Sequence, residues 1–250
     1  MIELGVTLDA IANLRESRKA KTPDPIFAAF LAEHAGASAI NVQLRGDRAH
    51  VQERDVNHLR ETVTIELNLV VTPRQEMARF ALTAKPDRVT FIPERLETAG
   101  GGGLDVMLNS SQLKERIREM RESSILPAIY LDPSIDQVKA AHQVGALGVE
   151  LSAESYVAAS ERIAMARDKE AVEREWQRLS DCTRLGAKLG LHVSVSHGLS
   201  LRNAPAVLGL GGVARINVGH DLVARAVMVG VERAVGGWMG LLENPGRNGN

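Results

Sequence analysis

The sequence predicts an α/β fold, a (β/α)8 TIM barrel with extra helices. Two observations predict it: short β-rich runs alternate with longer helical patterns along the chain, and each strand–helix pair takes about 25 to 35 residues. A chain of 250 residues is a common length for such a barrel. A doubly wound open sheet is the alternative, but the even spacing and the absence of a glycine fingerprint after the first strand favour the barrel. We expect one barrel domain over 1–243 and a flexible tail over 244–250.

The strands are expected in segments rich in β-formers. These segments are 2–9, 39–45, 65–71, 88–93, 126–132, 148–152, 192–197 and 215–220. In several of them apolar residues alternate with polar ones, as Val42 does with Asn41 and Gln43. Parallel strands are normally apolar on both faces, so a repeated polar face indicates a barrel whose polar residues point inward, toward the C-terminal mouth. An amphipathic antiparallel sheet with one wet face is the other interpretation.

Helices are expected between these strands. Residues 24–35 have Pro25 near their first turn, where proline is well tolerated. Residues 221–235 have an apolar stripe at helical spacing. The segment 154–190 is too long for one helix, so we expect an extra helix there.

Composition excludes several classes of protein. The formal net charge of −1 argues against a nucleic-acid binder that works through bulk charge. No apolar run approaches the ~20 residues of a membrane helix, and the amino terminus does not have the pattern of a signal peptide. The lone Cys182 excludes a disulfide framework. We therefore expect a cytoplasmic protein with neither a nucleic-acid nor a membrane partner, and with no metal and no cofactor.

Two strand ends have the features of an anion site. Ser196, His197 and Gly198 follow the seventh strand, and Gly219 and His220 follow the eighth, just before a helix. Glycine lets backbone N–H groups approach a ligand closely, and a helix amino terminus adds unpaired donors and positive potential. Barrels often bind phosphate at these two junctions. Structural glycine turns with structural histidines are the alternative.

A group of basic residues could bind a second anion. Arg45, Arg48 and His50 follow the second strand, and Arg18 lies in the first loop. Arginine's forked donors suit anions, although a single arginine is more often a solvated surface charge. Glu150 is expected inside the barrel, where a carboxylate is costly unless it is paired or used in chemistry; a bridge to Arg45 is one such pairing.

The loop after the fourth strand contains four consecutive glycines, at 100–103. Such a run is flexible and could close over a bound substrate as a lid. Flexible linkers have the same composition.

The chain resembles the pyridoxine 5'-phosphate synthase family of vitamin B6 biosynthesis. The resemblance rests on segments spread over nearly the whole chain, in the order and spacing that the family has. They are GVTLDAIANLRESR, PDPIFAAFLAEHAGASAINVQLRGDRAH, KPDRVTFIPER, GGGLDV, VSHGL and INVGHDLVARAVMVG. It implies a (β/α)8 barrel with extra helices, assembled as a homo-octamer. It also implies condensation of 1-deoxy-D-xylulose 5-phosphate with 3-amino-2-oxopropyl phosphate, which releases phosphate and water.

The resemblance also implies roles for individual residues. Glu150 and His197 correspond to groups that transfer protons, and Asp9 to an aspartate of the active site. Residues implied in binding the phosphorylated substrates are Arg18, Arg45, Arg48, His50, Gly198, Gly219 and His220.

Four positions depart from the family pattern: Thr7, Ala10, Gln43 and Val70. The family has an Asn and a His in the segment that ends the first strand, a His on the second strand and a Glu on the third. Valine cannot abstract a proton, and glutamine is no acid–base group at pH 7. Three hypotheses follow: a divergent synthase, an enzyme with different chemistry on a related phosphorylated substrate, or a non-catalytic paralogue that binds such a metabolite or has a regulatory role.

Overall fold

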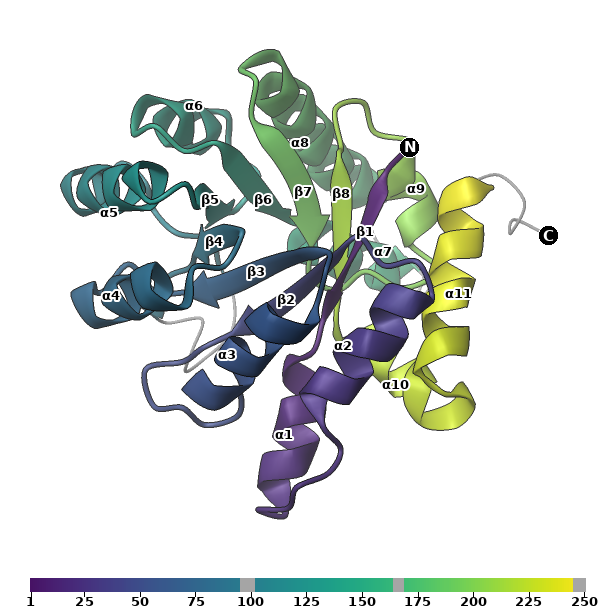
Figure 1. Ribbon diagram of the computed structural model, residues 1–250. Coiled ribbons are helices and arrows are strands. Elements are labelled where there is room, and N and C mark those ends of the chain that lie inside the picture. The colour runs from purple at the N-terminus through teal and green to yellow at the C-terminus, as the bar shows by residue number, and fades with distance from the viewer. Residues whose placement is uncertain (95–101, 164–168, 245–250) are drawn as a thin grey trace.

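The predicted barrel is confirmed in the computed structural model, in which eight parallel strands close in sequence order, with β8 pairing back onto β1 (Figure 1). The structure describes residues 1–94, 102–163 and 169–244. Parallel pairing of every neighbouring strand excludes both the antiparallel sheet and the open doubly wound sheet. No helix within the described ranges is long and apolar enough to cross a membrane.

The strands are short and follow the predicted segments closely. They are β1 (Glu3–Thr7), β2 (Ala39–Gln43), β3 (Glu66–Val71), β4 (Arg88–Phe91), β5 (Leu126–Leu131), β6 (Gly148–Ser152), β7 (His192–Ser196) and β8 (Arg215–Val218). Two predicted ends are wrong, because Asp9 and His220 each belong to the helix that follows the strand. The chain turns there as soon as it leaves the barrel wall, so both side chains lie at its C-terminal rim.

The helices surround the barrel (Figure 1). They are α1 (Asp9–Ser17), α2 (Pro25–His34), α3 (Glu53–Thr62), α4 (Gln75–Ala84), α5 (Ser110–Glu122), α6 (Ile135–Gln143), α7 (Glu154–Ile163), α8 (Lys169–Lys188), α9 (Ala204–Leu208), α10 (His220–Val229) and α11 (Val231–Glu243). The predicted start of α2 is confirmed: Pro25 is its first residue, and the Asp24 carboxylate accepts a hydrogen bond from Ile26 N–H at 2.9 Å. The extra helix between β6 and β7 is confirmed as the pair α7 and α8.

The prediction of a single helix over 221–235 is wrong. The chain breaks at Gly230, whose φ of +89° is a conformation that favours glycine. Helix α11 then packs against both α10 and α2, which Figure 1 shows as the yellow helix beside the purple one. Trp238, fully buried, anchors α11 to the barrel.

The polar faces of the strands point into the barrel, as the alternation predicts. Asn41 on β2 bonds to Asn217 on β8 and thus reaches past β1, and such a contact can form only through the interior. The alternate residues, such as Ile40 and Val42, are fully buried and belong to the core between the strands and the surrounding helices.

An ion cluster occupies the interior at the amino-terminal ends of the strands. Glu66 on β3 accepts from Arg88 on β4 at 2.7 Å and from Arg215 on β8 at 2.5 Å. Arg215 also donates to Glu3 at 2.6 Å. Burial and the two arginines lower the pKa of the neighbouring His192 to about 4, so it is neutral near pH 7. The cluster therefore holds four charged side chains from four strands across the end of the barrel opposite the mouth.

Candidate active site

A cavity of about 730 Å³ opens at the carboxyl ends of the strands. Its size is within the range of small-molecule sites. Its lining comes from the ends of β1, β2, β3, β5, β6, β7 and β8 and from the chain segments after them. Among the predicted site residues, it brings together Asp9, Glu150, His197, Gly198, Gly219 and His220.

The junction after β7 is a tight turn built for a glycine. His197 and Gly198 have φ of 67° and 72°, and a Cβ on Gly198 would press against Val157 at 3.1 Å. The His197 ring is held on two sides: its Nδ1 lies 2.8 Å from Ser196 Oγ, and its centroid lies 4.6 Å from that of the Tyr130 ring. The imidazole therefore has a fixed place on the cavity wall.

The junction after β8 gives the cavity the amino terminus of a helix. Gly219 precedes α10, and its side-chain-free backbone leaves the first turn without a side-chain cap. The N–H groups of a first turn have no partner within the helix, and the helix dipole adds positive potential there. The residues His197, Gly198, Gly219 and His220 all line the same cavity, so the two turns predicted to share an anion site do lie on one wall.

Glu150 lies inside the barrel with 8% of its surface exposed. Its carboxylate accepts a hydrogen bond from Asn217 Nδ2 at 2.8 Å. The proposed bridge to Arg45 is not what the structure has, because the Arg45 guanidinium pairs with Asp47 in its own loop, at 2.9 and 2.7 Å. An amide from β8, rather than an arginine, thus holds the carboxylate in place.

Polar side chains, most of them amides, form a connected layer that includes the floor of the cavity. Asn217 accepts from Asn41 at 3.2 Å, Asn41 accepts from Asn68 at 2.9 Å, and Asn68 accepts from Thr90 at 3.0 Å. Each of these side chains is 5% exposed or less. These hydrogen bonds provide partners for the buried amides, as buried polar groups require. At one end the layer reaches Glu150 through Asn217.

Gly5 on β1 makes room for this layer, and Gly5→Ala is expected to destabilise the protein by about 1–3 kcal/mol. A Cβ there would collide with Asn217 Oδ1 and lie 2.8 Å from Asn41 Nδ2. Urea unfolding monitored by circular dichroism measures the change. Gly236→Ala is the matched control, because nothing lies within 4 Å of its Cβ on the exposed side of α11. Equal stability of the two variants would contradict the packing argument.

Among the described lining residues, Asp9 is the one acid–base group on the β1–β3 side of the mouth. Its carboxylate accepts a hydrogen bond from Gln43 N–H at 2.8 Å. Burial raises the pKa of Asp9 to about 7, and the hydrogen bond from Gln43 only partly opposes the rise. Asp9 therefore changes charge near neutral pH.

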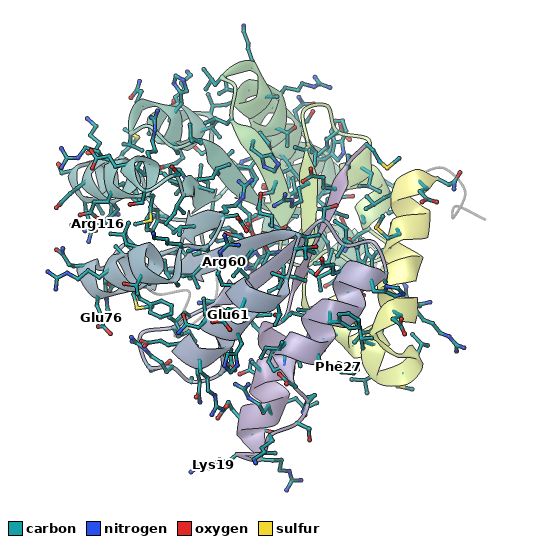
Figure 2. The ribbon with its side chains drawn as sticks, viewed as in Figure 1. Lys19, Phe27, Arg60, Glu61, Glu76 and Arg116 are labelled. Carbon is teal, nitrogen blue, oxygen red and sulfur yellow. The ribbon has the colours of Figure 1, made fainter. Side chains whose placement is uncertain are left out.

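The predicted basic group does not line the cavity. Arg48 donates to Gly46 O and to the carboxylates of Glu53 and Glu76; Figure 2 shows Glu76 on the outer helix α4. Arg18 is exposed at the end of α1, next to Lys19, which Figure 2 places at the far tip of that helix.

His50 is buried in the same loop, where its Nδ1 accepts from Val51 N–H at 2.7 Å. Burial, together with the charge of Arg45, lowers its pKa. A role in sugar-phosphate binding for Arg18, Arg45, Arg48 and His50 stays a prediction.

The four positions predicted to depart from the family pattern all lie on the cavity wall. They are Thr7, Ala10, Gln43 and Val70. Gln43 and Val70 are neighbours in the register of β2 and β3. The mouth thus has one side, formed by β6–β8, that carries Glu150 and His197, and a second side on which Asp9 is the only carboxylate among the described lining residues.

The charge of the described lining is acidic. Its carboxylates are Asp9, Glu150, Glu154, Glu161 and Asp221, and it contains no lysine or arginine. A phosphate in this cavity would therefore depend on backbone N–H groups, the α10 dipole and the two histidines. No cluster of the described side chains has the composition of a metal site.

Two cavity residues were not singled out from the sequence. Asn217 and Tyr130 both lie in predicted strand segments, but neither was named as a site residue. The residues of β5 are apolar on both faces apart from Tyr130, so no alternation marked it; the structure places it beside Glu150 in the strand register. Of the predicted glycine lid, Gly100 and Gly101 lie outside the described residues, as do residues 245–250 of the predicted tail. Gly103 packs directly on the backbone at Leu131 and Asp132.

The chain was compared with known proteins and solved structures. Among solved structures, KGPDC from Streptococcus mutans has a TM-score of 0.64 at 13% identity, covering 97% of this chain and 98% of that one. Thiamine phosphate pyrophosphorylase from Pyrococcus furiosus has a TM-score of 0.61 at 15% identity, covering 98% and 96%. At such low identity these structures show the barrel fold alone.

Sequence relatives are much closer. Pyridoxine 5'-phosphate synthase of Geotalea uraniireducens is 39% identical over 236 residues, and that of Syntrophotalea carbinolica is 41% identical; each match covers 94% of this chain and 96% of the relative. The family model described as "Pyridoxal phosphate biosynthesis protein PdxJ" matches residues 4–244. The chain therefore belongs to the PdxJ family of pyridoxal phosphate biosynthesis proteins.

Proposed function

We propose that the protein is a pyridoxine 5'-phosphate synthase, which condenses 1-deoxy-D-xylulose 5-phosphate with 3-amino-2-oxopropyl phosphate. The observation that carries the proposal is the shared cavity, in which Glu150 and His197 lie beside the two glycine turns. The relatives that bear this name match nearly their whole length to this chain. Glu150 and His197 would transfer the protons that the condensation and its dehydrations require.

In this proposal the glycine turns bind a substrate phosphate. Gly198, Gly219 and His220 bring backbone donors and the amino terminus of α10 to one wall, and such termini bind phosphate without a neighbouring lysine. The direct test incubates the purified protein with both substrates and follows pyridoxine 5'-phosphate by chromatography. Product formation that depends on both substrates is expected; no product at high enzyme concentration would overturn the proposal.

A second candidate is a phosphometabolite protein with altered or absent chemistry. The observation that favours it is that Ala10, Gln43 and Val70 carry no acid–base group, which leaves Asp9 as the only carboxylate among the described lining residues on that side. The double variant Gln43→His, Val70→Glu separates the candidates. A wild type that binds 1-deoxy-D-xylulose 5-phosphate without turnover, together with an active double variant, would support the second candidate.

Phosphate binding is expected to weaken as pH rises through about 7. Asp9 becomes negatively charged there and adds electrostatic repulsion inside a cavity that already contains Glu150. Between pH 6 and 8 the wild type should lose about 3- to 10-fold more affinity for inorganic phosphate than Asp9→Asn, as measured by calorimetry. Phosphate itself also titrates in this range, and the variant is the control for that effect. If affinity changed with pH equally in the two proteins, the result would contradict the role of Asp9.

We also propose that the chain forms a homo-oligomer, an octamer by family resemblance. Large apolar side chains are exposed on α2 and α10, among them Phe27 at 61% and Met228 at 81%. Figure 2 shows Phe27 on the outer surface of α2. Exposed apolar patches of this kind often mark protein interfaces. Sedimentation equilibrium measures the assembly, and a monomer at micromolar concentration would contradict it.

A further inference from the structure

Two polar atoms at the cavity are shielded from solvent and have no hydrogen-bond partner among the described residues. They are Gln43 Nε2 and Tyr130 Oη. Both side chains line the cavity. Buried donors without acceptors cost free energy, and native proteins retain few of them. A ligand in the cavity that these side chains line would be one source of the missing acceptors.

Tyr130 lies on β5 and is completely buried. Its neighbour in the strand register is Glu150 on β6, and its ring packs against that of His197. The Ser152 side chain is close to the phenol oxygen, but no hydrogen bond of good geometry joins them. Burial, with the charge of Glu150, raises the pKa of the phenol. Tyr130 is therefore a neutral donor and cannot act as a base near pH 7.

Gln43 lies on β2, which β3 and β4 separate from β5 around the barrel. Its backbone N–H is already used by Asp9, whereas its side-chain amide is not paired. An amide does not titrate, so this donor is also neutral. Between the two donors, Val70 at the end of β3 and Ile92 after β4 add apolar surface to the lining.

We propose that Gln43 and Tyr130 form a donor subsite for uncharged oxygens, with each side chain donating to a carbonyl or hydroxyl group of the substrate and the carbon chain lying against Val70 and Ile92. An anionic group is disfavoured there, because Glu150 adjoins Tyr130 and Asp9 adjoins Gln43. The phosphate then lies at the glycine turns of β7 and β8. The subsite rests on the proposed function only in taking a phosphorylated ketone as the ligand.

The test compares two ligands by calorimetry: 1-deoxy-D-xylulose 5-phosphate, which has keto and hydroxyl oxygens, and propyl phosphate, which has none outside its phosphate group. The wild type should bind the sugar phosphate at least about 10-fold more tightly. Tyr130→Phe and Gln43→Leu should each weaken sugar-phosphate binding about 3- to 10-fold and leave propyl phosphate within about 2-fold. Tyr156→Phe, at the other tyrosine, is the matched control and should change neither affinity.

Thermal unfolding without ligand gives an independent readout. Tyr130→Phe removes a hydroxyl that has no partner, so its Tm should equal or exceed that of the wild type. A lower Tm would show that the hydroxyl is structural and would overturn the subsite. Equal binding of the two ligands by the wild type, binding of neither, or an equal loss for both ligands in Tyr130→Phe would also overturn it.

The two proposals fail separately. A wild type that shows the selective binding but makes no pyridoxine 5'-phosphate removes the proposed function and leaves the subsite. A wild type that makes the product but binds both ligands equally removes the subsite alone.

Discussion

Glu150→Gln is expected to lower kcat for pyridoxine 5'-phosphate synthesis by about 10²–10⁴-fold, the usual loss when an acid–base group is removed. Glutamine has nearly the same shape, and its carbonyl oxygen can still accept the hydrogen bond from Asn217 that holds the carboxylate at 2.8 Å. The fold and the cavity should therefore persist while the proton transfer is lost. Steady-state kinetics with both substrates measures the effect.

Glu154→Gln is the matched control. It makes the same chemical change at an exposed carboxylate of the same cavity, at the first residue of α7. The control should retain kcat within about 3-fold, because an exposed carboxylate at the rim is not expected to transfer the proton. Similar losses in both variants would assign the effect to the charge of the cavity. No loss in Glu150→Gln would remove Glu150 from the proton transfers.

Glu66→Ala is expected to destabilise the protein by about 3–5 kcal/mol, the cost of leaving buried charges without their partner. The substitution removes the carboxylate shared by Arg88 and Arg215, which are 3% and 4% exposed. Glu3 would remain as a partner for Arg215 alone. Unfolding in urea measures the change. Glu94→Gln is the control, since its ion pair with Arg74 is exposed and should contribute at most about 1 kcal/mol.

The same cluster predicts a loss of stability in acid. Burial alone would raise the pKa of Glu66, but the hydrogen bonds from Arg88 and Arg215 outweigh it and lower the pKa from 4.5 to about 2. A pKa lower in the folded state means that the stabilisation is complete above about pH 4.5 and is lost as pH falls toward 2. Urea unfolding curves measured between pH 5 and 2 give the free energy of unfolding at each pH. This free energy should fall less steeply with decreasing pH in Glu66→Ala than in the wild type. An equal slope would contradict the role of the cluster.

The barrel could be predicted because its signals are local. Alternation at a period of two placed Asn41 and Glu150 inside, and Pro25 near the first turn located the start of α2 to within one residue. The break at Gly230 could not be predicted in the same way, because the apolar stripe continues across it and only the left-handed backbone of the glycine ends the helix.

The site was harder to predict, because its contacts join distant segments. Arg48 pairs with Glu76, 28 residues further along the chain. This contact neutralises an arginine that the sequence analysis predicted to bind an anion. Tyr130 lies in a strand whose residues are mostly apolar, and its place beside Glu150 becomes visible only once β5 and β6 are paired. The two glycine turns were correctly predicted to lie together, because barrel geometry alone brings the ends of β7 and β8 together. Their binding of an anion stays a prediction.

The amide layer forms the floor of the cavity, the ion cluster lies at the opposite end of the barrel, and both join strands on several sides of it. Much of the polar cross-bracing of the scaffold is therefore independent of the side chains at the rim, such as Gln43 and Val70. Replacements at the rim can alter reactivity while the scaffold keeps its shape. Because stability and reactivity depend on different sets of side chains, the scaffold should tolerate substitutions at the rim during the evolution, or the laboratory redesign, of new substrate preferences.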